Sequence, residues 1–144
     1  MNFHVDPDHS IGFALKRLQQ ALRSRMDAAL AEHGLTTPQY AVLAMLGEHP
    51  GISNAELARR NFVAPPTMLR MLHALSESGL IDRAAPSPDQ RSRGNALTKT
   101  GERRLAAASP SVQGFEDLLR TQTDPEQVEI IMAWLRDCAE QLDG

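Results

Sequence analysis

The chain has 144 residues, 42% of them hydrophobic and 23% charged, which suits one compact domain, alone or with a dimerising extension, and excludes a disordered protein. No apolar run could span a bilayer and the first residues lack the pattern of a signal peptide, so we expect a cytoplasmic protein without a membrane partner. The formal net charge is −3, yet residues 59–104 carry +5 between segments of −2 and −6, which is typical of a polyanion-binding module on an acidic scaffold.

Only six residues are aromatic, so the core would consist mainly of Leu, Ala, Met and Val, a composition that favours packed helices over a sheet. A first long helix is predicted to begin near residue 11, with Asp8 or Ser10 as its N-cap and Gly34 as its stop. Its apolar residues recur at steps of three and four and are Ile11, Leu15, Leu18, Leu22, Met26, Ala29 and Leu30.

Shorter helices follow. Thr37 and Pro38 predict the start of a second helix, a hydroxyl cap followed by proline at the first helical position, and Gly47 with Pro50 and Gly51 predicts its end. Ser53 and Glu56 have the spacing of a capping box, in which each side chain bonds a free backbone N–H, so a short third helix is expected there.

A fourth helix is predicted from the two prolines at 65 and 66 to about Ser78, with Gly79 at its C-terminal end. A helix, a short turn and a second helix at this spacing indicate a helix-turn-helix motif. Residues 80–83 and 96–98 then predict two short strands, joined by a segment rich in turn-forming and basic residues. Two strands with a basic tip directly after such a helix pair predict a winged helix.

The remaining chain predicts two more helices. Thr98 or Thr100 would cap a helix that is interrupted near Ser109 and Pro110, and a last helix follows the Asp124 cap. The predicted fold class is mainly α, with a winged helix-turn-helix DNA-binding region at residues 35–103. Residues 1–34 and 104–144 would form a helical dimerisation region, because their long apolar stripes exceed what this short chain can cover, and a homodimer is expected.

The fourth helix would place two different faces toward core and solvent. At 100° per residue, Met68, Leu69, Leu72 and Leu75 gather on one side, and Pro66, Thr67, Arg70 and His73 gather on the other. The N-terminal part of such a helix meets base edges in the major groove, so Arg70 could donate two hydrogen bonds to a guanine and Thr67 could reach a base or a phosphate. The alternative is that Arg70 is an ordinary solvated arginine. Ser53 and Asn54, at the start of the preceding helix, complete the DNA-binding set predicted for this motif.

The basic tip of the wing supplies the other candidate DNA contacts. Arg91 and Arg93 are two residues apart and would point the same way from a strand edge, toward a narrow, electronegative minor groove. Asp89 opposes attraction to DNA unless it pairs with Arg91 or bonds turn amides. We therefore interpret Asp89 as organising the wing, Arg93 as the groove residue, and Arg91 as sharing both roles.

These elements together resemble the MarR family of bacterial winged-helix regulators. The most specific stretches are residues 79–83, then Asp89 and Arg91, then Leu97-Thr98 followed by Gly101, and residues 37–40 and 53–57 are similar as well. The resemblance implies a homodimer, joined through its first and last helices, that binds a pseudo-palindromic double-stranded operator and represses transcription. It also implies release from DNA by a small aromatic or phenolic molecule.

Two departures from the family pattern affect the recognition helix. Ala64, Pro65 and Pro66 stand where the family has a serine-rich turn, and Leu69 stands where a threonine is common.

The effector pocket is expected where the first helix, the helix of Tyr40 and the start of the helix at residue 99 converge, as an apolar cleft.

Other functions have less support. Motifs of phosphate-binding loops, serine hydrolases and metal enzymes are missing, so an enzyme is not expected, and no cofactor is predicted. The histidines lack the spacing of a zinc site, and Cys138 is interpreted as an inert core residue. A winged-helix module that binds proteins, or a constitutive repressor without a ligand, stays as an alternative.

Overall fold

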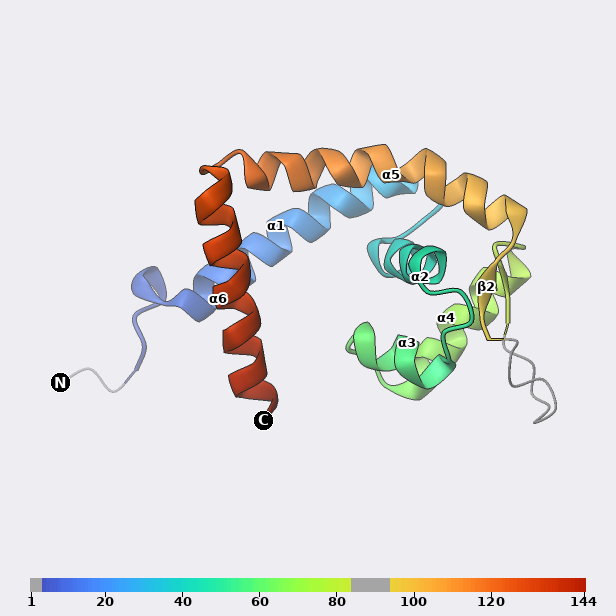
Figure 1. Ribbon diagram of the computed structural model, residues 1–144, viewed down its shortest axis with the longest axis horizontal. Helices are drawn as coiled ribbons and strands as arrows, with labels where there is room; N and C mark the ends of the chain where they lie inside the picture. Colours follow the sequence, from blue (N-terminus) through green and yellow to red (C-terminus); the bar gives the residue numbers. More distant parts are fainter. Residues whose placement is uncertain (1–3, 84–93) are drawn as a thin grey trace. The chain divides into compact units, whose positions relative to one another are not determined.

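The computed structural model describes residues 4–83 and 94–144, and the described chain is mainly helical (Figure 1). Its elements, in order, are a 3-10 helix η1 (Pro7–His9), α1 (Ile11–Ala31), α2 (Thr37–Glu48), α3 (Asn54–Arg60), α4 (Pro65–Glu77), β1 (Ile81–Asp82), β2 (Ala96–Leu97), α5 (Lys99–Arg120) and α6 (Pro125–Asp143). This order confirms the predicted fold class, a mainly helical chain with a two-stranded wing.

The chain forms two compact units, residues 1–110 and 111–144, and the division falls inside α5 directly after Pro110. The predicted interruption of this helix near Pro110 is wrong, since α5 runs through it for 22 residues. Proline removes one backbone hydrogen bond, yet the helix continues on both sides of Pro110. The hydroxyl of Ser109 also donates to the carbonyl of Leu105 at 2.7 Å.

The core of the first unit is built around α2, α3, α4 and β1. Its buried apolar residues are Leu30, Leu35, Val42, Leu43, Leu46, Leu57, Ala58, Met68, Leu72, Leu75, Leu80, Ile81 and Ala108. The two strands pair antiparallel, with Ile81 opposite Leu97 and Asp82 opposite Ala96. Each helix therefore buries one apolar side against its neighbours, and the wing extends from this packed base.

The cap of α2 differs from the prediction by one residue. Thr36, not Thr37, is the N-cap, and it forms a capping box with Gln39. Thr37 instead donates its backbone N–H and its hydroxyl to Oδ1 of Asp27 on α1, at 2.9 and 2.6 Å. The tertiary bond to Asp27 thus takes the hydroxyl that the local pattern assigned to the cap. The helix ends at Glu48, between Gly47 and Pro50, as the sequence predicts.

The start of α5 is fixed by Thr98 rather than by Thr100. The hydroxyl of Thr98 accepts from the N–H of Gly101 at 3.0 Å and donates to the carbonyl of Gly79 at 2.6 Å. A Cβ atom on Gly101 would lie 2.0 Å from the carbonyl oxygen of Leu80, so only glycine allows this close approach. These contacts attach the wing base to the first turn of α5.

The second unit consists of the C-terminal part of α5 and α6. Asp124 caps α6 by accepting from the N–H of Gln127 at 2.8 Å, as the sequence predicts. Val128 is the buried apolar residue of α6, whereas Ile130, Ile131, Met132, Trp134 and Leu142 are exposed. Within the part of the chain that is described, no helix has the length and apolar character needed to cross a membrane.

Candidate nucleic-acid interface

Helix α4 follows α3 after a short turn (Figure 1), and the exposure of its side chains divides it into an inner and an outer side. Its inner side is buried and consists of Met68, Leu72 and Leu75. On its outer side Pro66, Arg70 and His73 are exposed and Thr67 is half-buried, and a guanidinium N–H of Arg70 donates to the Thr67 hydroxyl at 3.3 Å. The structure therefore brings the four predicted α4 residues to one accessible side of the helix.

The assignment of Leu69 to the core side is wrong. Its exposed fraction is 42%, because it lies at the border of the inner side and no neighbouring element covers it. It is three residues from Pro66 and four from His73, so it shares their side of the helix. The outer side of α4 is thus more apolar than the sequence indicates.

The start of α3 is tied to the base of the wing. The hydroxyl of Ser53 accepts from the N–H of Glu56 at 3.1 Å, and Asn54 is the first helical residue. The side-chain amide of Asn95, which is completely buried, donates to Oδ1 of Asn54 at 2.7 Å and to the carbonyl of Ile52 at 3.0 Å. Asn95 thus fixes the loop that leads into α3. Sequence analysis overlooked it, since a polar residue before a strand gives no signal of burial.

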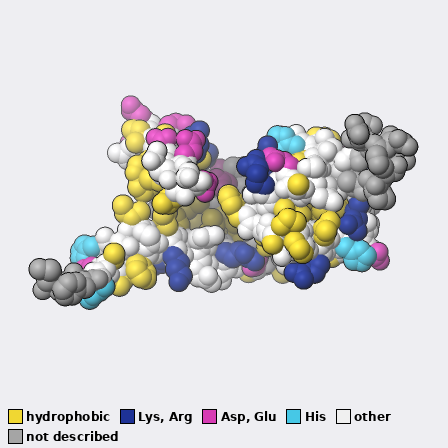
Figure 2. All heavy atoms as spheres, turned by 90° about the horizontal axis from the view of Figure 1, so that it is seen from below, with side chains coloured by type: hydrophobic (Ala, Val, Ile, Leu, Met, Phe, Trp, Pro, Cys, Tyr) yellow, Lys and Arg dark blue, Asp and Glu magenta, His cyan; other side chains and the backbone are white. Residues whose placement is uncertain are grey.

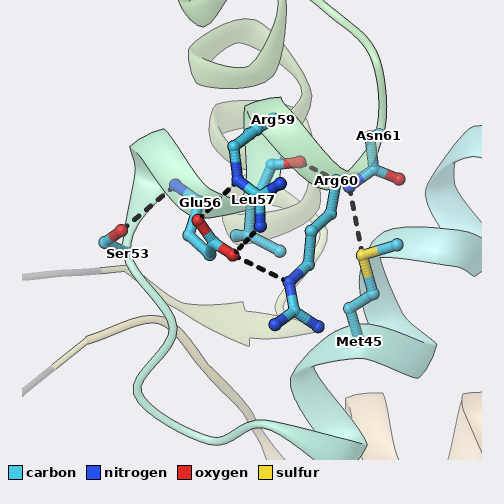
Figure 3. A network of polar contacts seen from close by, with 7 residues as sticks. All are labelled: Met45, Ser53, Glu56, Leu57, Arg59, Arg60 and Asn61. Atoms are coloured by element: carbon cyan, nitrogen blue, oxygen red, sulfur yellow. Dashed lines mark hydrogen bonds and ion pairs between the residues drawn. The ribbon is translucent and has the colours of Figure 1, made fainter. Parts of the chain in front are cut away.

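Only half of the predicted capping box of α3 forms. The carboxylate of Glu56 does not bond back to Ser53; it accepts instead from Nε of Arg59 at 3.0 Å and from Nε of Arg60 at 2.9 Å (Figure 3). Two guanidinium groups are stronger partners for a carboxylate than one backbone N–H. These hydrogen bonds, with that of Arg59 contributing most, lower the pKa of Glu56 to about 2. The two arginines, which the sequence analysis did not single out, lie on the exposed side of α3.

The turn between the two helices holds an unusual residue. Phe62 has a φ of 55°, a left-handed conformation that is uncommon for bulky side chains, and its exposed fraction is 90%. The sequence analysis did not select this residue. Asn61, beside it, donates to the carbonyl of Leu57 at 2.7 Å and to Sδ of Met45 at 3.3 Å, which ties the end of α3 to α2 (Figure 3). The predicted wing residues Asp89, Arg91 and Arg93 lie outside the described residues.

Comparisons with known proteins agree with this architecture. A family model described as the MarR family matches residues 35–92. The HTH-type transcriptional repressor Rv2887 of Mycobacterium tuberculosis is 37% identical over 129 residues, which are 85% of this chain and 88% of the relative. The chain belongs to the MarR family.

Solved MarR-family structures have the same fold. The transcriptional repressor CouR bound to a 23-mer DNA duplex is 30% identical, with a TM-score of 0.80 over 92% of this chain and 94% of that one. Rv2887 from Mycobacterium tuberculosis in complex with salicylic acid is 31% identical, with a TM-score of 0.69 over 91% and 97% of the two chains. The sequence interpretation as a winged-helix transcriptional regulator of the MarR family is confirmed, and the relatives are regulators, not enzymes.

This MarR-family chain has two cavities in the first unit, near the place where the sequence predicts an effector pocket. One, of about 430 Å³, lies between the end of α2, β2 and α5, and the other, of about 550 Å³, lies between the end of α1 and the start of α5. The first is lined by Leu46, Gly47, Pro50, Ala96, Leu97, Glu102, Leu105, Ala106 and Ser109. The hydroxyl of Tyr40 lies 3.2 Å from that of Ser109, so α2 is bonded to α5 beside this cavity.

A reactive cysteine and a metal site are the two other kinds of sensor group that this chain could carry. Cys138 is half-buried on α6, which differs from the core position expected from the sequence, because this side of α6 is not fully covered within one chain. Across residues 4–83 and 94–144, no three His, Cys, Asp or Glu side chains come together in a way that could hold a metal ion.

Proposed function

We propose that this protein represses transcription by binding, as a homodimer, a pseudo-palindromic operator in double-stranded DNA. The observation that carries this proposal is the outer side of α4, where Pro66, Thr67, Arg70 and His73 are accessible while the inner side anchors the helix in the core. A rigid helix with an exposed arginine near its N-terminal end suits base recognition in the major groove. Arg70 is the candidate for a guanine contact.

The start of α3 supplies contacts to the DNA backbone in this proposal. Because Asn95 donates to the amide oxygen of Asn54, the amide nitrogen of Asn54 stays available to donate to a phosphate. Ser53 lies beside it at the N-terminus of α3. The wing would reach the adjacent minor groove, with Arg93 in the groove, Asp89 organising the tip, and Arg91 serving both roles.

Dimerisation would place two copies of α4 on successive major grooves, roughly 34 Å apart. We assign it to residues 1–34 and 104–144, because α1 and α6 leave apolar side chains exposed within one chain. These exposed residues are Ile11, Phe13, Leu15, Leu18, Ile130, Ile131, Met132, Trp134 and Leu142. Surfaces of this kind on a small protein mark contacts with another molecule, here a second copy of the chain.

The DNA-binding proposal is tested by titrating the protein with a duplex from the region upstream of its gene and with a scrambled duplex of the same composition. We expect affinity for both to fall steeply with salt, because phosphate contacts release counterions, while the upstream duplex stays bound at least about 1,000-fold more tightly. Equal affinity for the two duplexes at every salt concentration would contradict sequence-specific binding, and a protein-binding module would then be the better interpretation.

We further infer that a small aromatic molecule releases the protein from DNA by binding the cavity between α2, β2 and α5. Two observations on relatives support this: Rv2887 has been solved with salicylic acid, and CouR with p-coumaroyl-CoA. A cavity of about 430 Å³ with mainly small and aliphatic lining residues is of a size that suits a single ring. Because β2 forms the wing base, a ligand that prefers another position of this strand would lower DNA affinity by population shift.

Two neighbouring alanines on α5 provide a matched test of this cavity. Ala106 lines the cavity beside α2, and Ala107 lines the cavity beside α1. We expect salicylate to release wild-type protein and Ala107→Phe from the duplex, and to leave Ala106→Phe bound, since the added ring fills the proposed site. The opposite pattern would place the effector beside α1. Release of neither variant nor wild type by salicylate or related phenols would favour a constitutive repressor.

A further inference from the structure

The first turn of α4 is unusually poor in hydrogen-bond donors. The first three backbone N–H groups of a helix normally stay free for a ligand, but Pro65 and Pro66 have none. The N–H of Met68 donates to the carbonyl of Ala64 at 3.1 Å. The N–H of Thr67 is therefore the backbone donor of this turn that remains for a ligand. Ala64 provides no side-chain cap. This end of the recognition helix therefore offers little polar recognition apart from Thr67 and Arg70.

The N-terminal end of α4 exposes apolar side chains in place of hydrogen-bond donors. Pro66 and Leu69 are both exposed and lie three residues apart on the outer side of α4, beside Arg70. Ala64 and Pro65, just before them, are exposed as well. Figure 2 shows hydrophobic side chains gathered on the lower face of the winged-helix lobe, with Lys and Arg side chains around them. We call Ala64, Pro65, Pro66 and Leu69 the apolar surface of α4.

The charges around this surface favour DNA over a protein partner. Arg70 lies on the same side of the helix, and residues 59–104 carry a net charge of +5. The acidic residue nearest in sequence on α3, Glu56, is already neutralised by Arg59 and Arg60. The apolar surface thus lies within a basic segment, which suits a groove flanked by phosphates.

We propose that Leu69, which lies beside Pro66 on the outer side of α4, recognises thymine in the operator by contact with its C5-methyl group. This inference rests on the proposed DNA-binding function and names the base that α4 selects. In the major groove the thymine methyl is the apolar group of the base edges, and an apolar side chain is its natural partner. Arg70 would recognise a guanine nearby, because Leu69 and Arg70 lie three and four residues from Pro66 and therefore flank it on the helix surface.

The experiment removes the methyl group without changing hydrogen bonding. Duplexes are first selected from a random library by the full-length protein, and each thymine of the enriched half-site is then replaced by uracil. At one or more positions per half-site we expect an affinity loss of about fourfold per methyl, equivalent to about 0.8 kcal/mol, and about 15-fold when both half-sites are changed. Uracil in the flanking DNA serves as the control and should change nothing.

Variants at Leu69 test whether its side chain is the one that contacts the methyl group. Leu69→Ala should bind the thymine duplex more weakly by a similar factor and should no longer distinguish thymine from uracil, a coupling that a double-mutant cycle measures. Leu69→Met keeps an apolar side chain of similar volume and should retain the distinction. Circular dichroism of the variants checks that both remain folded.

Three results would contradict either the thymine contact or the proposed DNA-binding function. If a specific sequence is enriched but uracil replaces each of its thymines without loss, the thymine inference fails and the proposed DNA-binding function stands. If wild type distinguishes thymine from uracil but Leu69→Ala does so equally well, the methyl contact belongs to another residue and the inference fails as well. If no sequence is enriched, the proposed function itself fails.

Discussion

The winged-helix lobe and the terminal helices use their apolar residues in opposite ways. In the lobe, α4 has 13 residues and buries Met68, Leu72 and Leu75. The much longer α1, with 21 residues, buries only Leu30, and α6, with 19 residues, buries only Val128. The lobe therefore completes its core within one chain, whereas the terminal helices leave much of their apolar surface exposed.

This difference indicates which region depends on a second copy. A helix whose apolar side stays exposed gains little from folding alone, because most helical stability in proteins comes from packing. We therefore expect the lobe to owe its stability to its own core and the terminal helices to owe theirs to the dimer. Four sets of substitutions test this contrast.

The largest effect is expected in the core of the lobe. Leu72 is completely buried, so Leu72→Ala removes apolar contacts and leaves a cavity, and the free energy of unfolding should fall by about 2–5 kcal/mol. Urea denaturation followed by circular dichroism measures this loss. Leu142→Ala makes the same chemical change on α6, where the lost contacts would be those of the proposed dimer, so at concentrations where the chain is monomeric its free energy of unfolding should stay within about 0.5 kcal/mol of wild type. Similar losses in both variants would erase the contrast.

A charge on the exposed side of α6 should dissociate the dimer. Ile131 is about half exposed, and Ile131→Glu would bury a carboxylate in the proposed interface, so we expect the dimer dissociation constant to rise by at least about 100-fold, or about 2.7 kcal/mol. Leu15→Glu on α1 should act in the same direction. Sedimentation equilibrium from nanomolar to micromolar concentrations measures the change.

Gln141→Glu is the control for the dimer, since it adds the same charge at an exposed polar position of α6. Its dissociation constant should match that of wild type. A wild-type protein that is monomeric at micromolar concentration would refute the assignment of the terminal helices to dimerisation.

Substitutions on the outer side of α4 and in the predicted wing should weaken DNA binding and leave the dimer intact. Arg70→Ala should cost about 1–3 kcal/mol of binding free energy on the specific duplex and less on random DNA, because a base contact is lost. Arg93→Ala should weaken binding to both duplexes alike. It should also reduce the slope of log affinity against log salt concentration by about one, as expected for a minor-groove or phosphate contact. Fluorescence anisotropy with both duplexes gives these values, and equal losses for Arg70→Ala would make it a phosphate contact.

Local patterns predicted most of the fold because they depend on neighbouring residues alone. The capping residue Ser53, the pair Asp124 and Pro125, and Gly79 after α4 each act within one turn of chain, and all three mark element ends as predicted. The two strands were predicted for the same reason, from short apolar runs bounded by turn residues.

The errors arise where a contact comes from far along the chain. Thr37 was predicted as a cap, but Asp27, ten residues earlier, takes its hydroxyl. Leu69 looks like a core residue by its periodicity, and only the packing of the other elements reveals that nothing covers it. Asn95 acts on residues more than 40 positions away, so a local pattern could not have selected it. The DNA contacts of the lobe and the pairing of terminal helices stay predictions.

The smallest effect concerns the bond that joins the two regions. Asp27 on α1 accepts from the hydroxyl and the N–H of Thr37 at the start of α2, and Nε of Arg23 donates to it at 3.1 Å. The hydrogen bonds from Thr37 are the main cause that lowers the pKa of Asp27 below its ordinary value of 3.8. The charged form is therefore favoured in the folded state. Its contribution to stability is present above the unfolded pKa and is lost as the pH falls through the folded pKa.

Asp27→Asn tests this sign directly. The variant should be slightly less stable than wild type at pH 7, and the difference should shrink as the pH falls from 3.8 through the lowered pKa of folded Asp27, because the wild-type carboxylate then loses its charge. Urea midpoints of the two proteins at pH 7 and pH 3 measure the change, and Asp143→Asn, at an exposed position near the C-terminus, controls for the removal of a charge. The same difference at both pH values would mean that the Thr37 contact does not depend on the charge of Asp27. Packing between α1 and the start of α2, and not the charge of Asp27, would then hold the terminal helix to the lobe.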